Sequence, residues 1–165
     1  MHDDADPQAS ATDPIARAMG EWGRIEPGAD ADAMEVVLRL ARLGERISAE
    51  VGAVHRAAGL EPGDFDVLAT LLRRGPSAPT VLARELLLSK AGMSGRIARL
   101  RERGLIEEAA REDDRRGKSI ALSTRGEEIV RGLVVEHSRA EARALEPLSA
   151  AQRAALLELL RAAWR

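Results

Sequence analysis

The side chains in this sequence that are best suited to chemistry are cationic, and they gather in one stretch. Residues 84–118 hold 10 Lys or Arg against 7 Asp or Glu, whereas residues 1–58 hold 6 against 11. The formal net charge of the 165 residues is −2, so the local excess of three positive charges is more informative than the total. Guanidinium and ammonium groups form charge-assisted hydrogen bonds with phosphates. The stretch therefore indicates a surface that binds a polyanion such as a nucleic acid.

Other kinds of site have little support in the residue types. The chain has no cysteine, which excludes disulfides, thiolate metal ligands and thiol redox chemistry. Its three histidines, His2, His55 and His137, are too scattered to match a metal-ligand spacing. We find no nucleophile–base pair and no Gly-rich phosphate loop. We therefore predict that the chain is not an enzyme and that it needs no cofactor or metal.

The cationic stretch is expected to lie on a helix-turn-helix that is followed by a two-stranded hairpin. The first helix, TVLARELLL, would begin at Thr80 as its N-cap, and the second would begin at the capping hydroxyl of Ser89 and end at Gly104. A short strand, the charged segment REDDRRGK and the alternating strand SIALS then form the hairpin. This arrangement is a winged helix-turn-helix, so the predicted fold class is mainly α with a small β-wing.

The second helix of this pair has two different faces. Met93, Ile97, Leu100 and Gly104 are spaced by 4, 3 and 4 residues, which places them on one stripe that packs against the domain. The opposite side is small, polar or cationic, which suits the floor of a DNA major groove and equally suits a solvated face. The candidate DNA contacts on this helix are Ser89, Lys90, Ser94, Gly95 and Arg99. Those at the hairpin tip, for phosphates or a narrow minor groove, are Arg115, Arg116 and Lys118.

Helices are also expected on both sides of this region. A short helix with Thr12 or Asp13 as its N-cap would place Trp22 on its apolar face. A long helix over residues 32–58 carries an apolar seam, and residues 60–74 form the next helix.

Two capping boxes mark the C-terminal helices. They are Thr124 with Glu127, opening a helix to about Leu145, and Ser149 with Gln152. The surplus apolar surface of these helices and of the 32–58 seam predicts packing within the chain together with packing against a second copy of it.

The segment DDRRGKSIALSTRG resembles the wing signature of the MarR family of bacterial transcription regulators. The matching positions are Asp114, Arg116, Gly117, Leu122, Ser123 and Gly126. The resemblance extends upstream through GDFDVLATLLRRGP and LLSKAGMSGRIARLRERGLI, which is similar to the family's recognition helix. It implies a homodimeric regulator, usually a repressor that a small molecule releases, whose two recognition helices enter successive major grooves of a pseudo-palindromic operator.

The N-terminal segment resembles the PecS-like, urate-responsive subgroup of that family. This resemblance implies that Trp22, Asp66 and Arg96 line a pocket for an anionic ligand. A further arginine of the subgroup is replaced here by Glu108, and a carboxylate would repel an anion. The resemblance implies a small anionic effector, which is either urate or, because of this replacement, another anion such as a di- or tricarboxylate.

Each residue of that predicted pocket also has a simpler interpretation. Trp22 could anchor a core, Asp66 could be a first-turn carboxylate that the helix dipole favours, and Arg96 could bind phosphate.

The predicted organisation follows from these features. Residues 1–31 form a flexible N-terminus with a short extra helix, and residues 32–165 form the MarR-type domain. Within that domain, residues 60–122 are the DNA-binding lobe, and 32–58 with 124–165 are the dimerisation helices. No signal peptide and no apolar run of roughly 18 residues is present, which predicts a cytoplasmic protein without membrane contact. The rival interpretation is a winged-helix module that binds protein instead of DNA.

Overall fold

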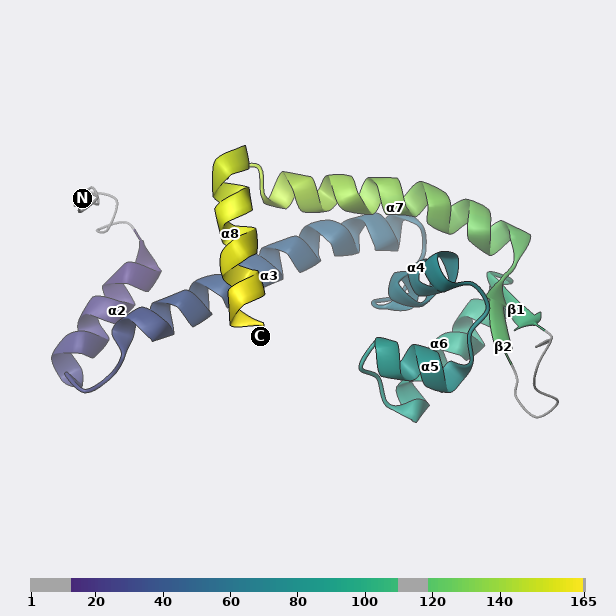
Figure 1. The fold of residues 1–165 in the computed structure, drawn as a ribbon, viewed down its shortest axis with the longest axis horizontal. Coiled ribbons are helices and arrows are strands. Elements are labelled where there is room, and N and C mark those ends of the chain that lie inside the picture. The colour runs from purple at the N-terminus through teal and green to yellow at the C-terminus, as the bar shows by residue number, and fades with distance from the viewer. Residues whose placement is uncertain (1–12, 110–118, 165) are drawn as a thin grey trace. The chain divides into compact units, whose positions relative to one another are not determined.

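The computed structural model describes residues 13–109 and 119–164, and the chain divides between residues 49 and 50 into two compact units. The first unit holds α2 (Pro14–Ile25) and most of α3 (Ala31–Ala57). The second unit holds the end of α3 and the remaining elements (Figure 1), namely α4 (Asp64–Arg74), α5 (Pro79–Glu85), α6 (Lys90–Glu102), β1 (Ile106–Ala109), β2 (Ser119–Leu122), α7 (Thr124–Ala144) and α8 (Ala150–Ala163). This mainly helical chain with one small sheet confirms the expected fold class. In the described ranges, no helix combines the length and apolar character that a membrane crossing requires.

In the first unit, α2 begins at a side-chain cap and packs against α3. Of the two candidate caps it is Asp13 whose Oδ1 accepts hydrogen bonds from the backbone N–H groups of Ile15 (2.9 Å) and Ala16 (3.3 Å). Arg39 of α3 donates to the other oxygen of Asp13 at 2.6 Å, and this bond is the main reason that the pKa of Asp13 is lowered. Trp22 is 46% exposed and lines an apolar groove of about 620 Å³ between α2 and α3.

The second unit is built around a core shared by α4, α5, α6, the hairpin and α7. Its central residues are Leu68, Leu82, Met93, Leu100, Ile120 and Val130, all of which are buried. The predicted inward stripe of α6 is confirmed, because Met93, Ile97 and Leu100 are all buried. The face of α6 opposite this stripe is therefore the one that stays at the surface.

The limits of α6 agree with the sequence, whereas those of α5 do not. Ser89 caps α6 by accepting a hydrogen bond from the N–H of Gly92 at 3.1 Å, and Gly104 adopts the left-handed conformation after the helix (φ 66°). The prediction that Thr80 caps α5 is wrong. The helix begins at Pro79 with Ala78 as its N-cap, because proline needs no hydrogen-bond acceptor for its nitrogen in the first turn.

The hairpin pairs β1 with β2 in antiparallel register, with Ile106 opposite Leu122 and Ala109 opposite Ser119. A bridge between Ser77 and Ile120 adds the loop after α4 to the same sheet, with both hydrogen bonds at 2.9 Å. The sheet thereby joins the hairpin to the helical core. The hairpin tip, with the predicted contacts Arg115, Arg116 and Lys118, lies outside the described residues.

Two helix starts differ from the prediction. The N-cap of α7 is Ser123, whose hydroxyl accepts from the N–H of Gly126 at 3.0 Å, so the predicted capping box at Thr124 is wrong. Helix α4 begins at Asp64 instead of residue 60, because Gly63 has a φ of 79° that a helix does not allow. The capping box that opens α8 is confirmed.

Candidate nucleic-acid interface

The N-terminal half of α6 presents a surface of short side chains. Lys90, Ser94 and Gly95 are all exposed, and Ser89 at the start of the helix combines its capping bond with an exposed position. Short residues allow a helix backbone to approach a groove closely, and hydroxyl and ammonium groups at its N-terminal end can reach bases and phosphates. The geometry is therefore suited to insertion into a major groove.

Arg99 lies at the edge of that surface and is held from one side. Its Nη2 donates to Oδ1 of Asp64 at 2.9 Å, and the Arg99 side chain remains 44% exposed while that of Asp64 is only 1% exposed. Its Nη1 lies 3.9 Å from the position that a Cβ on Gly95 would occupy. The guanidinium of Arg99 therefore lies between the buried start of α4 and the exposed face of α6.

Arg96 of α6 and Arg103, the C-cap residue directly after α6, bind the linker between α3 and α4. Arg96 donates from Nη1 to the carbonyl of Gly63 at 2.9 Å. Arg103 donates from Nη1 to the carbonyl of Gly59 at 2.5 Å and from Nη2 to that of Ala58 at 3.3 Å. Arg96, Arg99 and Arg103 follow the i, i+3, i+7 spacing of one helix face. We call these three residues the arginine ladder.

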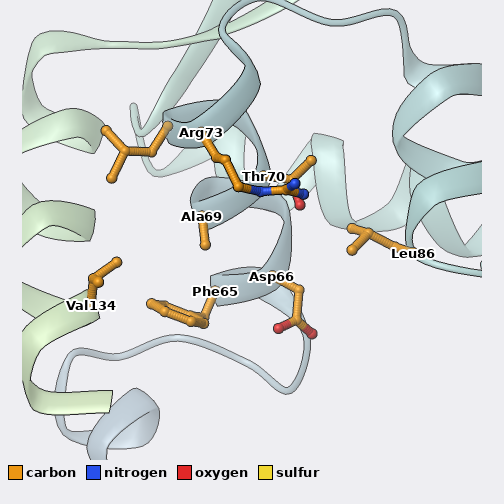
Figure 2. A pocket seen from close by; sticks show the side chains of 8 residues that line it. Phe65, Asp66, Ala69, Thr70, Arg73, Leu86 and Val134 are labelled. Atoms are coloured by element: carbon orange, nitrogen blue, oxygen red, sulfur yellow. The ribbon is translucent and has the colours of Figure 1, made fainter. Parts of the chain in front are cut away.

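A pocket of about 450 Å³ lies beside α4 in the same unit. Figure 2 shows Val134 of α7 and Leu86, which follows α5, on opposite sides of α4. The lining is mostly apolar, with one carboxylate and one guanidinium, and consists of Phe65, Asp66, Ala69, Thr70, Leu72, Arg73, Leu86 and Val134. The volume and the mixture of apolar walls with a few polar groups are typical of small-molecule sites.

The guanidinium in this pocket is only loosely paired. Arg73 Nη2 lies 3.8 Å from Oε2 of Glu85, whereas Arg74 Nη1 approaches the other oxygen of that carboxylate to 3.1 Å. Arg73 is therefore the lining residue best placed to receive an anion.

The three residues predicted for an effector pocket have different surroundings. Asp66 is exposed and lines the pocket beside α4, whereas Arg96 is engaged with the linker. Trp22 belongs to the first unit and lines the groove there. Glu108 accepts a hydrogen bond from Arg101 Nη2 at 3.1 Å, so its charge is engaged by an arginine of α6. The joint role of Trp22, Asp66 and Arg96 stays a prediction.

A cluster of three rings lies next to the pocket, which Phe65 also lines. Phe65, His55 and His137 form a cluster in which each ring contacts the other two, with centroids 4.5 Å (Phe65–His55), 4.4 Å (Phe65–His137) and 5.2 Å (His55–His137) apart, and His55 Nε2 lies 3.1 Å from His137 Nδ1. Burial lowers the pKa of His55, and the charge of His137 lowers it further, while Asp66 opposes the shift. Among the residues that the structure covers, no group of three or more His, Asp or Glu is placed to hold a metal ion.

Sequence reasoning missed two residues of this region, Asp64 and Arg103. The spacing of the arginine ladder was visible in the sequence, but its partners lie 33 to 45 residues earlier in the chain. No local pattern connects residues over such a separation.

Residues 58–117 match the model of the MarR family. The chain is 29% identical over 149 residues to the HTH-type transcriptional regulator PecS of Dickeya dadantii, which covers 88% of this chain and 90% of that protein.

Two solved structures illustrate the similarity of the fold. BpsR of Bordetella bronchiseptica, whose DNA binding is regulated by 6-hydroxynicotinic acid, is 24% identical with a TM-score of 0.69, over 79% of this chain and 99% of that one. A mutant of MarR from E. coli, complexed with operator DNA, is 18% identical with a TM-score of 0.68, over 87% and 98% of the two chains. The family model, the sequence relative and the solved structures agree: residues 58–117 resemble the MarR family of transcription regulators, and the chain has the winged-helix fold of these solved structures.

Proposed function

We propose that this protein is a ligand-responsive transcription regulator that binds a pseudo-palindromic operator as a homodimer. The observation that carries the proposal is the exposed N-terminal half of α6, with its short side chains and its flanking arginine, on a fold that the E. coli MarR mutant shares in complex with operator DNA. The protein acts as a repressor, and a small anionic metabolite releases it.

In this proposal the two parts of the winged lobe read different features of DNA. The α6 residues enter the major groove, with Lys90 and Arg99 reaching phosphates or base edges and Ser94 and Gly95 allowing close approach. Ser89 contributes at the N-terminal end of the helix, where the helix dipole favours a phosphate. The wing residues Arg115, Arg116 and Lys118 contact phosphates or the flanking minor groove.

The effector site in this proposal is the pocket beside α4. Its apolar walls suit a small planar ring, and Arg73 suits a carboxylate. BpsR, which responds to 6-hydroxynicotinic acid, shares the fold. Asp66 supplies a hydrogen-bond acceptor at the same pocket. The effector class is a small carboxylate or urate, and its binding changes the spacing of the two recognition helices in the dimer.

The test is a selection of duplexes from a random-sequence pool by the purified protein, followed by affinity measurements on the enriched duplex and on a scrambled duplex of equal length. We expect selective binding that weakens steeply as salt rises. Arg116→Ala should weaken binding to both duplexes and lower the salt dependence, because it removes a phosphate or minor-groove contact. Addition of 6-hydroxynicotinate, urate or citrate tests release.

The outcomes separate the two parts of the proposal. Enrichment of no sequence at any salt concentration would overturn DNA recognition and favour a protein-interaction module. Selective binding that none of the three compounds relieves would leave the regulator standing and contradict the effector class.

A further inference from the structure

We infer that Asp64 is a positioning residue for DNA recognition, which acts by holding Arg99 in the orientation from which α6 meets DNA. The inference rests on the proposed DNA-binding function. Asp64 is the first residue of α4 and is almost fully buried. Burial of a carboxylate is costly unless its oxygens are paired. Both oxygens are used, since Oδ1 accepts from Arg99 at 2.9 Å and Oδ2 accepts from the N–H of Glu61 at 3.3 Å.

The ion pair engages Arg99 from one side only. A guanidinium is a rigid planar fork of donors, and contact through one nitrogen to a fixed carboxylate restricts the plane of the whole group. Since the Arg99 side chain is still 44% exposed, its other donors can meet a base edge or a phosphate without leaving Asp64. Restraint of the side chain before binding removes part of the entropy cost that a free arginine incurs on the DNA.

The other two arginines of the ladder hold α6 against the linker between α3 and α4, and so fix its position relative to Asp64 at the start of α4. Arg96 and Arg103 hold α6 against the carbonyls of residues 58, 59 and 63, one on each side of Arg99. The guanidinium of Arg96 lies where a Cβ on Gly63 would point, so this side chain packs directly against the linker. Of the three arginines, only Arg99 forms an ion pair with a carboxylate among the described residues. The orientation of Arg99 is therefore the feature that a change of charge at Asp64 can alter.

The deciding variant is Asp64→Asn, measured on the enriched duplex and on the scrambled duplex. The substitution removes a negative charge next to the DNA-facing surface, so binding to scrambled DNA should stay equal or become tighter. Binding to the enriched duplex should weaken about tenfold, because a misoriented arginine loses most of a specific contact. The ratio of the two affinities therefore falls. A protein that has merely lost folded structure would lose both affinities together.

Glu61→Gln is the matched control. Glu61 is an exposed carboxylate in the same linker, and its backbone N–H bond to Asp64 does not depend on its side chain. This variant makes the same change in net charge three positions away, and it should keep the wild-type affinity ratio.

A second variant keeps the inference open to test if Asp64→Asn does not fold. Arg99→Lys retains the positive charge at an exposed position and removes the planar fork. It should lower the affinity ratio about tenfold without changing the salt dependence on scrambled DNA. Where both single variants fold, the double variant should be no worse than either single one, because both remove the same oriented contact.

The failures of the inference and of the proposed function are distinguishable. Absence of sequence-selective binding by the wild-type protein would overturn the proposed function, and with it this inference. Selective binding by the wild type that Asp64→Asn or Arg99→Lys leaves unchanged would overturn the inference alone. A parallel loss of both affinities, or additive losses in the double variant, would assign the pair to folding or to separate contacts and would also overturn it.

Discussion

Asp64 and Asp66 are two positions apart on α4 and have opposite surroundings. Side chains at i and i+2 of a helix point in nearly opposite directions. Asp64 is buried against Arg99 of α6, while Asp66 is exposed and lines the pocket beside α4. One turn of one helix thus carries a group for each of the two proposed sites. If effector binding moves this turn of α4, the ion pair between Asp64 and Arg99 transmits the movement directly to α6.

The buried His55 gives the first prediction at this scale, a dependence of stability on pH. Its pKa is lowered in the folded chain from the ordinary value of 6.5, mainly by burial. Well above pH 6.5 the ring is neutral in both the folded and the unfolded chain, so its titration takes nothing from the free energy of unfolding. As pH falls through 6.5, the unfolded chain takes up a proton that folded His55 does not. The free energy of unfolding should then decrease, by at most about 1.4 kcal/mol per pH unit, down to the folded pKa.

Urea unfolding between pH 5 and pH 8 measures this dependence. The variant His55→Gln should show a shallower dependence than the wild type between pH 6.5 and the acid end, because it removes the titrating ring. His137 and Asp66, which act on the pKa of His55, and Glu141, which contacts His137, remain in both proteins. Equal slopes in wild type and variant would contradict the assignment to His55.

At the scale of elements, the closest backbone approach at any described glycine is made at the start of α7. A Cβ placed on Gly126 would lie 1.9 Å from the carbonyl oxygen of Leu105 and 2.8 Å from its carbonyl carbon. Both partners are backbone, and Ser123 donates from its N–H to the same oxygen at 3.1 Å. We therefore expect Gly126→Ala to lower the free energy of unfolding by about 3 kcal/mol, through overpacking that only a shift of the helix can relieve.

Gly132 in the same helix offers the matched control. No atom lies within 4 Å of a Cβ at that position, and the residue is exposed. Gly132→Ala should raise the free energy of unfolding by about 0.5–1 kcal/mol, because alanine has the higher helix propensity. Chemical denaturation of both variants measures these changes in the free energy of unfolding. A small effect at Gly126, similar in size to that at Gly132, would refute the close-packing argument.

Local features of these helices could be predicted from the sequence, whereas contacts between distant residues could not. Apolar spacing predicted the inward stripe of α6, and capping chemistry predicted its start at Ser89, because both signals are local. The N-caps of α5 and α7 were placed one or two residues late, since several neighbouring residues could each have begun the helix. The Asp64–Arg99 pair joins residues 35 positions apart, so only the tertiary structure shows it.

At the scale of the whole molecule, the apolar surface left exposed is too large for a chain that acts alone. Leu157, Leu160 and Trp164 share one face of α8 by their i, i+3, i+7 spacing, and they are 47%, 44% and 91% exposed. None of the described residues of α8 is buried. Contiguous apolar surface of this kind indicates an interface. A second copy of the chain is the occupant that the proposed operator symmetry requires.

Replacing Leu157 and Leu160 together by Asp puts two charges on the exposed face of α8 and should convert a dimer into a monomer, which sedimentation equilibrium measures directly. Affinity for the enriched duplex should fall about a hundredfold, because two linked reading heads bind far more tightly than one. Leu87→Asp is the matched control, since Leu87 is 91% exposed but lies in the turn between α5 and α6; it should keep the dimer mass. A double variant that still sediments as a dimer would place the interface elsewhere, whereas a wild-type monomer would rule out symmetric operator binding by paired recognition helices.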